Sequence, residues 1–311
     1  MYTPVALAKE KALKETSVVG TWGDGEVSKS TGTDNPRPLA ISSPGRLGSV
    51  SLPHYTSHME NRPAVVTATV LAIDIGATSI KCGLVDPEGR LVDAVARVAT
   101  PYPCSPARLV ELVAGHVRES GCERVGVGFP GAMVDGMVVE PGNLSRPHGF
   151  TSPIDPTLHE EWLATDLQGA LREATGVDVR VVNDATLAAL GCCVGDGTEL
   201  VFTLGTGFGI ALVIDGELVA IRDVGAEEFV EGESYDRLLG EHARSQGTQR
   251  WSELLILAVS NFVKEFSPTL VHLGGGNSRR VDLSGFADLG VPVVVNGNDV
   301  TLSGAVKLFS R

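Results

Sequence analysis

From residue 65 onward, short runs of apolar, β-branched residues alternate with longer stretches in which apolar residues recur at helical spacing. The short runs predict buried strands and the longer stretches predict amphipathic helices, so the alternation indicates an α/β fold. A strand, its hairpin partner and a third strand come first, followed by a helix capped by Ser105, a strand, a second helix and a further strand. These elements cover residues 65–76, 81–89, 90–100, 105–120, 124–131, 160–176 and 177–185.

The same order restarts in the second half of the chain. Residues 198–219 contain a strand, a Gly-rich turn and a second strand that ends in a hairpin at Asp215 and Gly216. A long helix ending at Pro268, a strand running into three glycines, a last strand and a closing helix at 302–309 follow. We therefore predict two similar lobes with a central cleft. The predicted boundaries are 66–185 for the N-terminal lobe, 186–298 for the C-terminal lobe and 299–311 for the closing helix.

The first 65 residues have a different composition. Ser, Thr, Pro and Gly dominate and apolar periodicity is weak, so we interpret residues 1–65 as a disordered N-terminal extension. A brief helix capped by Thr3 is expected near its start. Four acidic residues argue against a transit peptide, namely Glu10, Glu15, Asp24 and Glu26.

Composition narrows the classes of protein that fit this chain. No apolar run reaches the roughly 18 residues that a membrane span needs, and no compact hydrophobic signal segment begins the chain. We therefore expect a cytoplasmic protein without a membrane partner. The net charge is −13 and the pI is about 5.0, so the overall field repels nucleic acid and we expect no nucleic-acid partner.

The cysteines and histidines show no ligand pattern in the sequence. Five cysteines are scattered without a CxxC pair, which suits a reducing compartment better than a disulfide framework. His116, His159, His242 and His272 share no metal-ligand spacing. We therefore expect no structural zinc site and interpret these histidines as surface or core residues.

The first candidate for chemistry is the turn between the first strand and its hairpin partner. Gly76 lets backbone N–H groups approach phosphate oxygens, Thr78 adds a hydroxyl donor and Lys81 supplies a cation. Asp74 is the candidate metal ligand, because a carboxylate can hold Mg²⁺ directly or through water. A hairpin in which Gly and Asp only serve the turn explains the same residues, so this motif alone leaves both interpretations open.

A second Gly-rich turn lies at the equivalent place in the second half of the chain. Its amide and hydroxyl donors point to phosphate binding, and two such turns facing each other would form a clamp. The candidate phosphate ligands are Gly205, Thr206, Gly207 and Gly209.

A third glycine cluster also follows a strand and predicts a binding site for a nucleotide or another phosphate donor. Two arginines beside it would steady a polyanionic donor, although adjacent surface arginines are usually just solvated. The candidate donor-binding residues are Gly274, Gly275, Gly276, Arg279 and Arg280.

A further candidate for chemistry is the pair Asn183 and Asp184 at the end of a buried strand. Asp184 is the candidate general base, because phosphoryl transfer needs a carboxylate within hydrogen-bond reach of the attacking hydroxyl. Asn183 can orient the same substrate as donor and acceptor. An Asn-Asp pair is also an ordinary N-cap for a helix starting at Ala185, and the pair by itself leaves this alternative open.

These motifs occur in the order found in one family. The chain from about residue 70 to residue 309 resembles the ROK (repressor, open reading frame, kinase) family and, within it, the polyphosphate glucokinases. The resemblance rests on the stretches DIGATSIKCGLVD, VGVGFPGAMVDG, NLS followed by Trp162, VVNDA, LGTGFGIAL and HLGGGNSRR.

The resemblance implies an actin-like ATPase (ribonuclease H-like) fold and a Mg²⁺-dependent sugar kinase. The donor would be ATP or polyphosphate, and the acceptor a hexose hydroxyl, expected to be the 6-hydroxyl of glucose. Asp184 is then expected to be the base, with Asn183 and Asn143 as sugar ligands. A homodimer is also suggested.

The chain departs from the family pattern at the expected sugar site. Family members carry a Glu-x-Gly-His element there, whereas residues 223–226 read Asp-Val-Gly-Ala. Asp223 would replace the Glu, and Glu227 or Glu228 would compensate for the missing His. A lost buried hydrogen bond costs about 1–3 kcal/mol, enough to redirect specificity without abolishing transfer.

A non-enzymatic protein is the competing hypothesis. The altered stretch at 223–226 would suit a sugar sensor or regulatory protein that keeps the fold but turns over poorly. Retention of Asp74, Lys81, Thr206 and Asp184 favours an enzyme, because a pure binding protein needs no base aimed at a phosphate clamp. Residues 1–65 show no helix-turn-helix with basic recognition positions, which weakens a DNA-binding repressor interpretation.

Overall fold

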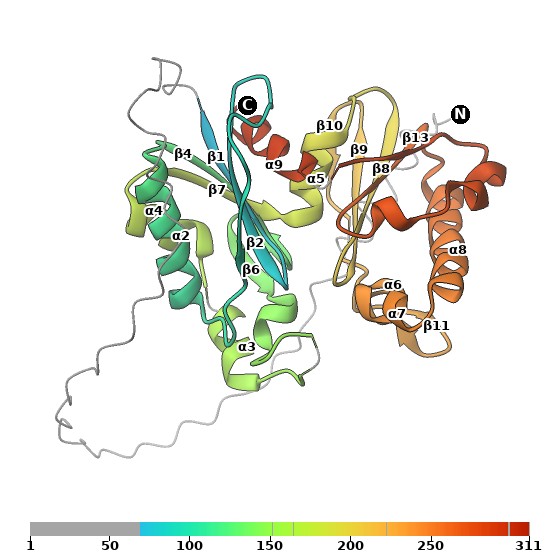
Figure 1. Ribbon diagram of the computed structural model, residues 1–311, viewed down its shortest axis with the longest axis horizontal. Helices are drawn as coiled ribbons and strands as arrows, with labels where there is room; N and C mark the ends of the chain where they lie inside the picture. Colours follow the sequence, from blue (N-terminus) through green and yellow to red (C-terminus); the bar gives the residue numbers. More distant parts are fainter. Residues whose placement is uncertain (1–68, 151, 164, 222, 298, 311) are drawn as a thin grey trace, which may run out of the picture.

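The computed structural model describes residues 69–310, apart from residues 151, 164, 222 and 298. The chain forms two lobes (Figure 1), each built on a five-stranded sheet. Residues of both lobes line one cavity. The predicted extension, residues 1–65, lies outside the described residues. Within the described part of the chain, no helix has both the length and the apolar character needed to cross a membrane.

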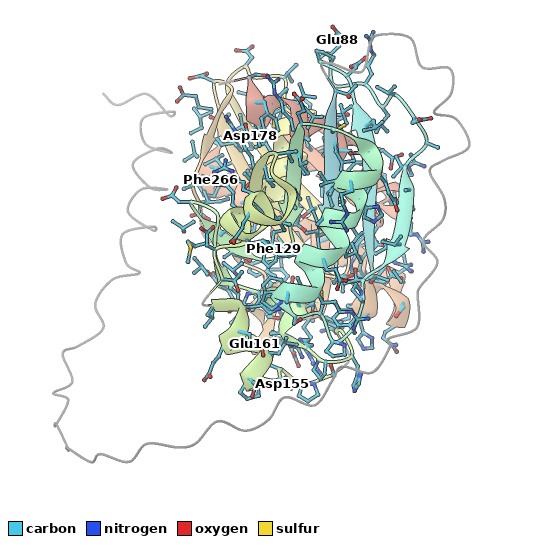
Figure 2. The ribbon with its side chains drawn as sticks, turned by 90° about the vertical axis from the view of Figure 1, so that its left-hand side faces the viewer. Glu88, Phe129, Asp155, Glu161, Asp178 and Phe266 are labelled. Atoms are coloured by element: carbon cyan, nitrogen blue, oxygen red, sulfur yellow. The ribbon has the colours of Figure 1, made fainter. Side chains whose placement is uncertain are left out.

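The N-terminal sheet joins an antiparallel meander to two parallel strands. Its order is β3-β2-β1-β4-β7, in which β1 pairs antiparallel with β2 and parallel with β4. Helices α2 (Pro106–Ser120) and α4 (Leu167–Thr175) cover its outer face, which Figure 2 shows from the front. The strands are β1 (Val70–Ile75), β2 (Ser79–Val85), β3 (Ala96–Ala99), β4 (Arg124–Phe129) and β7 (Asp178–Asn183).

The C-terminal sheet repeats this arrangement. Its order, β10-β9-β8-β13-β14, has the same succession of antiparallel and parallel neighbours. The long helix α8 (Thr248–Phe266) covers its outer face (Figure 1). The repeated topology confirms the predicted two-lobed, actin-like fold. The strands are β8 (Thr198–Leu204), β9 (Phe208–Ile214), β10 (Glu217–Val219), β13 (Leu270–Gly274) and β14 (Val293–Val295).

Helix α5 (Asp184–Cys192) lies between the two sheets, beside the short helix α9 (Val300–Ser303) (Figure 1). Its alanines pack on the inner face of the C-terminal sheet, whereas Leu187 packs with Leu302 and Ala305 against the N-terminal sheet. The chain end, which continues as a 3₁₀-helix over Gly304–Phe309, therefore returns to the N-terminal lobe.

The alternation of side chains along β1 aims a carboxylate at the space between the lobes. Leu71 and Ile73 belong to the core under α2 and α4, whereas Val70 and Ala72 face α9 and the chain end. Successive side chains of a strand point to opposite faces of the sheet. Asp74 is the next residue on the inner face, which is the face that carries α5.

Three predicted elements differ from those observed. The helix predicted at 160–176 is divided into α3 (Pro156–Leu163) and α4, because the Asp166 carboxylate accepts the Gly169 N–H over 2.8 Å and so caps a new helix. The strand predicted at 90–100 shortens to β3 after a loop in which Asp86 accepts backbone N–H groups. The closing helix becomes α9 followed by 3₁₀ turns that begin at Gly304.

Ser105 caps α2 as predicted, since its side chain accepts the Arg108 N–H. The structure also contains short elements that the pattern did not predict, several of which border the cavity. These are β5 (Ala132–Val134), β6 (Met137–Glu140), β11 (Glu228–Val230), β12 (Glu233–Ser234), α6 (Tyr235–Leu239), α7 (Glu241–Gln246) and 3₁₀ turns at Gly142–Ser145, Ser278–Arg280 and Leu283–Leu289.

Two glycines allow α5 to approach the chain end closely. A Cβ added at Gly191 would overlap the carbonyl oxygen of Val300, and one added at Gly304 would overlap that of Leu187. Backbone therefore packs on backbone at this crossing, and a side chain at either position would force the two segments apart.

We expect Gly191→Ala to lower the free energy of unfolding by about 1–3 kcal/mol, because overpacking displaces α9 from α5. The matched control is Gly115→Ala in α2, where an added Cβ meets no atom within 4 Å. That variant is expected to gain up to about 1 kcal/mol from helix propensity. Urea unfolding of both variants measures the difference, and equal effects would contradict the close crossing.

Candidate active site

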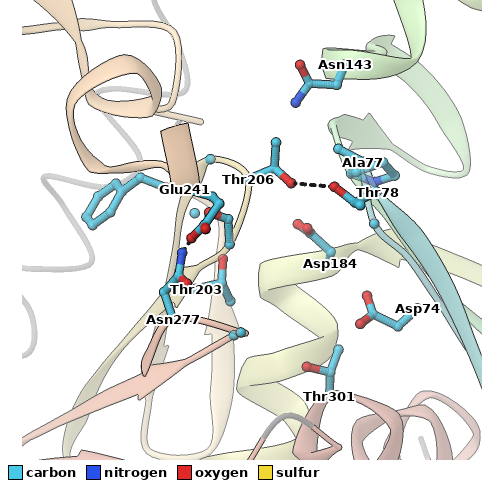
Figure 3. Close-up of a pocket in the computed structure, with 18 of the residues that line it drawn as sticks. Asp74, Ala77, Thr78, Asn143, Asp184, Thr203, Thr206, Glu241, Asn277 and Thr301 are labelled. Carbon is cyan, nitrogen blue, oxygen red and sulfur yellow. Dashed lines mark hydrogen bonds between the residues drawn. The ribbon is translucent and has the colours of Figure 1, made fainter. Parts of the chain in front are cut away.

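A cavity of about 460 Å³ lies between the lobes. The turn after β1 and the turn after β8 both line it, and the hydroxyl oxygens of Thr78 and Thr206 lie 3.3 Å apart across it (Figure 3). The two Gly-rich turns thus face each other. The predicted site residues that line the cavity are Asp74, Gly76, Thr78, Lys81, Asn143, Asn183, Asp184, Gly205, Thr206, Gly207, Gly209, Asp223, Gly275, Gly276 and Arg280.

Three predicted site residues are not part of this lining. Glu228 is exposed on β11, and Arg279 is exposed on the 3₁₀ turn after β13. Gly274 is buried as the last residue of β13. The structure therefore places Glu228, one of the two carboxylates proposed to compensate, and Arg279 on the surface and outside the cavity lining.

Asp74 and Lys81 are register partners in the β1–β2 pair, so their side chains share one face of the sheet. The Lys81 ammonium donates to the Asp74 carboxylate over 2.6 Å. The turn between them is held from outside by the Tyr102 hydroxyl, which donates to the Ala77 carbonyl over 2.7 Å. Because the Lys81 charge is already paired, an anion in this cavity depends mainly on backbone donors and on Arg280.

Two glycines in the lining have no structural reason to be glycine. An added Cβ at Gly205 or Gly276 would meet no protein atom within 4 Å, and neither residue has a positive φ. Gly275, by contrast, has φ +85° and packs against the backbone of Leu204. Without side chains, Gly205 and Gly276 leave their backbone open to an incoming group, as in phosphate-binding loops.

Asp184, the first residue of α5, lines the cavity next to Asp74 (Figure 3). Its carboxylate accepts the Ala185 N–H over 2.8 Å. Burial raises the pKa of Asp184 to about 8, and the negative charge of Asp74, followed by those of Asp223 and Asp236, acts in the same direction. A carboxyl with such a pKa can exchange a proton near neutral pH.

Asn183 caps α5 and also lines the cavity. Its side-chain oxygen accepts the N–H groups of Ala185 and Thr186 over 2.9 and 3.2 Å, and its amide nitrogen donates to the Gly131 carbonyl over 3.0 Å. The N-cap interpretation is therefore confirmed. Because a primary amide carries two N–H donors, the cap leaves one N–H for a ligand.

Asp236 is a cavity residue that the sequence does not predict. Its carboxylate accepts the Phe208 N–H over 2.7 Å and fills the space above Gly207 and Gly225, where a Cβ would crowd it. Burial raises the pKa of Asp236, and the charge of Asp223 adds to this effect. No local motif marks Asp236, because α6 reaches the cavity only through the fold.

Other lining residues were also not predicted. Arg97 comes from β3 and pairs with Asp299 over 2.9 Å, while Asn277 donates to the Gly205 carbonyl over 3.3 Å and so braces the second turn. Further members of this group are Thr203, Glu241, Thr301, Ala77, Ser79, Pro130, Gly131 and Phe208.

The cavity combines donors for an anion with a carboxyl that can take a proton. Two glycine turns line the cavity, and Arg280 adds a positively charged side chain to the lining. This set suits the transfer of an anionic group to an acceptor hydroxyl, with the carboxyl of Asp184 receiving the hydroxyl proton.

Two polyphosphate glucokinases of mycobacteria resemble the chain in sequence. It is 26% identical over 222 residues to the polyphosphate glucokinase of Mycobacterium leprae, a match covering 68% of this chain and 64% of that protein. It is 26% identical over 221 residues to the polyphosphate glucokinase of Mycobacterium tuberculosis, covering 68% and 78%. The chain thus spans less than two thirds of the length of the M. leprae relative.

Solved structures resemble the chain over most of its described part. The inorganic polyphosphate/ATP-glucomannokinase of Arthrobacter sp. strain KM superposes with a TM-score of 0.66 at 32% identity, covering 78% of this chain and 98% of that one. A ROK family glucokinase of Streptomyces griseus superposes with a TM-score of 0.62 at 19% identity, covering 78% and 99%, which supports the fold alone. Residues 70–225 also match the model of the ROK family. From this match, the repeated topology and the facing glycine turns, we conclude that the chain belongs to the ROK family.

Proposed function

We propose that this protein is a kinase that transfers a phosphoryl group from polyphosphate or ATP to a hexose hydroxyl, with the 6-hydroxyl of glucose as the leading acceptor. The observation that carries the proposal is the carboxyl group of Asp184 in a cavity whose two glycine turns face each other across it. The donor and sugar classes are supported by the names of the relatives at 26% and 32% identity.

Asp184 acts as the general base in this proposal. The sugar hydroxyl oxygen attacks the terminal phosphorus, the bond from that phosphorus to the donor's bridging oxygen breaks, and the hydroxyl proton passes to Asp184. The leaving group is ADP or a polyphosphate chain shortened by one unit. A base whose pKa lies near the working pH combines adequate basicity with a sufficient ionised fraction.

The donor's phosphates bind along the open backbone of the turns at Gly205 and Gly276, with Arg280 contributing charge. Mg²⁺, which the family implies, fits the carboxylate of Asp74, because this ion prefers hard oxygen ligands and keeps several of its waters. When bound, it supplies neutralisation of phosphate charge. The 2.6 Å ion pair with Lys81 holds the Asp74 side chain in place for this role.

The sugar binds at the end of the cavity that carries amide and carboxylate side chains. Asn143 and Asn183 offer amide donors, and Asp223 and Asp236 offer acceptors for sugar hydroxyls. Ala226 stands where the family has a His, so one sugar contact is missing. We therefore expect the sugar preference, rather than the transfer chemistry, to differ from that of the relatives.

A sugar sensor with little turnover is the second candidate function. The observation that favours it is the Asp-Val-Gly-Ala stretch at 223–226, which lacks the imidazole of the family pattern. Such a protein would bind sugar in the same cavity, and its Asp184 would contribute nothing measurable to a rate.

A coupled phosphorylation assay against a hexose panel, with ATP and with polyphosphate, tests the proposed function. We expect turnover with at least one pair, and a loss of about 10²–10⁴-fold in kcat for Asp184→Asn, because an amide cannot accept the proton. The fold should persist, since Asn keeps the oxygen that accepts the Ala185 N–H. Circular dichroism checks this.

Absence of turnover with every pair, combined with sugar binding in isothermal titration, would support the sensor instead. A wild-type rate in Asp184→Asn would remove Asp184 from the mechanism. The variant should also be at least as stable as the wild type above pH 8, where the half-buried carboxyl of the wild type, with its pKa raised from 3.8 to about 8, carries its charge.

The pH profile tests the charge environment of the base. We expect kcat/KM to rise with pH up to about 8, as the raised pKa of Asp184 requires. Asp236→Asn removes a negative charge that helps to raise the pKa of Asp184, so the acidic limb should move to lower pH. The exposed Asp288→Asn is the control and should leave the limb unchanged. If the acidic limb of the kcat/KM profile lies at the same pH in Asp236→Asn as in the wild type, the charge of Asp236 does not affect the pKa of Asp184.

Gly276→Ala tests the open backbone of the donor turn. The added methyl group meets no protein atom within 4 Å, so stability should stay equal or rise by up to about 1 kcal/mol. It protrudes toward the donor, and we expect KM for ATP or polyphosphate to rise about tenfold, the equivalent of one lost hydrogen bond. Sugar affinity should not change; an unaltered donor KM would argue against phosphate binding at this turn.

A further inference from the structure

Three side chains that bind soft metal ions meet in the C-terminal lobe, outside the lining of the active-site cavity. Cys192 is the last residue of α5, Cys193 is its C-cap residue, and His272 lies in the middle of β13. One ligand atom of each residue lies within 4.8 Å of the other two. His272 is only 3% exposed, and the two cysteines are half-buried.

The backbone at the end of α5 allows the sulfur atoms of two adjacent cysteines to lie close together near His272. Cys192 still has helical backbone geometry, whereas Cys193 is extended, with φ −69° and ψ 139°. In a zinc site, Zn–S bonds of about 2.3 Å and Zn–N bonds of about 2.0 Å place tetrahedral ligand atoms roughly 3.5–3.8 Å apart. The observed cluster therefore needs only small side-chain rotations to surround an ion.

A buried carboxylate orients the histidine of this cluster. Glu199 is 0% exposed, and its Oε2 lies 2.8 Å from Nε2 of His272. The N–H groups of Val194 and Gly195, directly after the cysteines, donate to the same carboxylate over 3.0 and 2.6 Å. Metal-bound histidines commonly donate their second ring N–H to a carboxylate, which fixes the ring orientation. A buried Glu–His pair is otherwise expensive and adds little stability.

One ring nitrogen and one coordination position remain to be assigned. With Nε2 of His272 held by Glu199, Nδ1 would be the atom for an ion, and an ion there would displace the Asn296 amide, which lies 3.2 Å from Nδ1. Cys193 also lines a second cavity of about 340 Å³. In the proposed site, water on the Cys193 side would complete a tetrahedron.

We propose that Cys192, Cys193 and His272 bind one zinc ion, with Glu199 as the residue that positions His272 and water as the fourth ligand. The sequence predicts no zinc site, because His272 is far from the cysteines along the chain; only the pairing of β13 with β8 brings it to the end of α5. The ion would tie the helix that begins at Asp184 to the strand that leads into the donor turn at Gly275.

Metal content and cobalt spectroscopy of the full-length protein test this site. Reduced wild-type protein, stripped with a chelator and then titrated with Zn²⁺, is expected to bind one equivalent and to gain thermal stability. Co²⁺ in its place should give a thiolate-to-metal charge-transfer band and the intense visible bands of a tetrahedral site. Cys192→Ser should lose the charge-transfer intensity and most of the affinity.

Two further variants separate a ligand site from a merely structural cluster. Glu199→Gln should lower zinc affinity about 10–100-fold while one equivalent still binds at saturation. Cys104→Ser, which changes a buried cysteine of the N-terminal lobe, should bind zinc like the wild type. Failure of the reduced wild type to retain zinc, a cobalt spectrum without a thiolate band, or equal affinity in Cys192→Ser and wild type would overturn the proposal. None of these readouts depends on kinase activity.

Discussion

Helix α5 packs against the sheets of both lobes, and this packing holds the carboxyl group of Asp184 in the lining of the cavity. Small side chains and glycines make this possible: Gly191 and Gly304 admit the chain end, and a Cβ at Gly128 would come within 3.4 Å of the Asp184 Cα. The same enclosure that fixes the position of Asp184 raises its pKa to about 8. The position of the Asp184 carboxyl and its raised pKa therefore both follow from the packing of α5.

The repeated topology supplies the rest of the site by symmetry. Each sheet ends an antiparallel pair in a Gly-rich turn, and the two turns meet where Thr78 and Thr206 approach to 3.3 Å. Backbone donors suit this place, because Asp74 neutralises the Lys81 charge and further carboxylates line the cavity. Under the proposed function, fixed amide dipoles would hold the anionic donor of this acidic chain without bringing a mobile side chain into the site.

The two ends of α5 have different chemistry. Its first residue is the proposed base, and its last turn carries the proposed zinc ligands, which contact the strand that continues into Gly275 and Gly276. Under both proposals, helix α5 holds the base and strand β13 leads into the donor turn. The two elements are then held together by the packing of their side chains and by a shared metal ion. Movement of one relative to the other would then be small.

The sequence by itself determined the two-lobed α/β order, both Gly-rich turns and the pair Asn183 and Asp184. These features depend on local patterns, since strand alternation and turn chemistry act over a few residues. Only the tertiary structure decided that Asp236 and Arg97 line the cavity, that Glu228 does not, and that His272 meets Cys192 and Cys193. Such contacts join residues far apart along the chain, and they arise from how helices and sheets pack, which no short motif encodes.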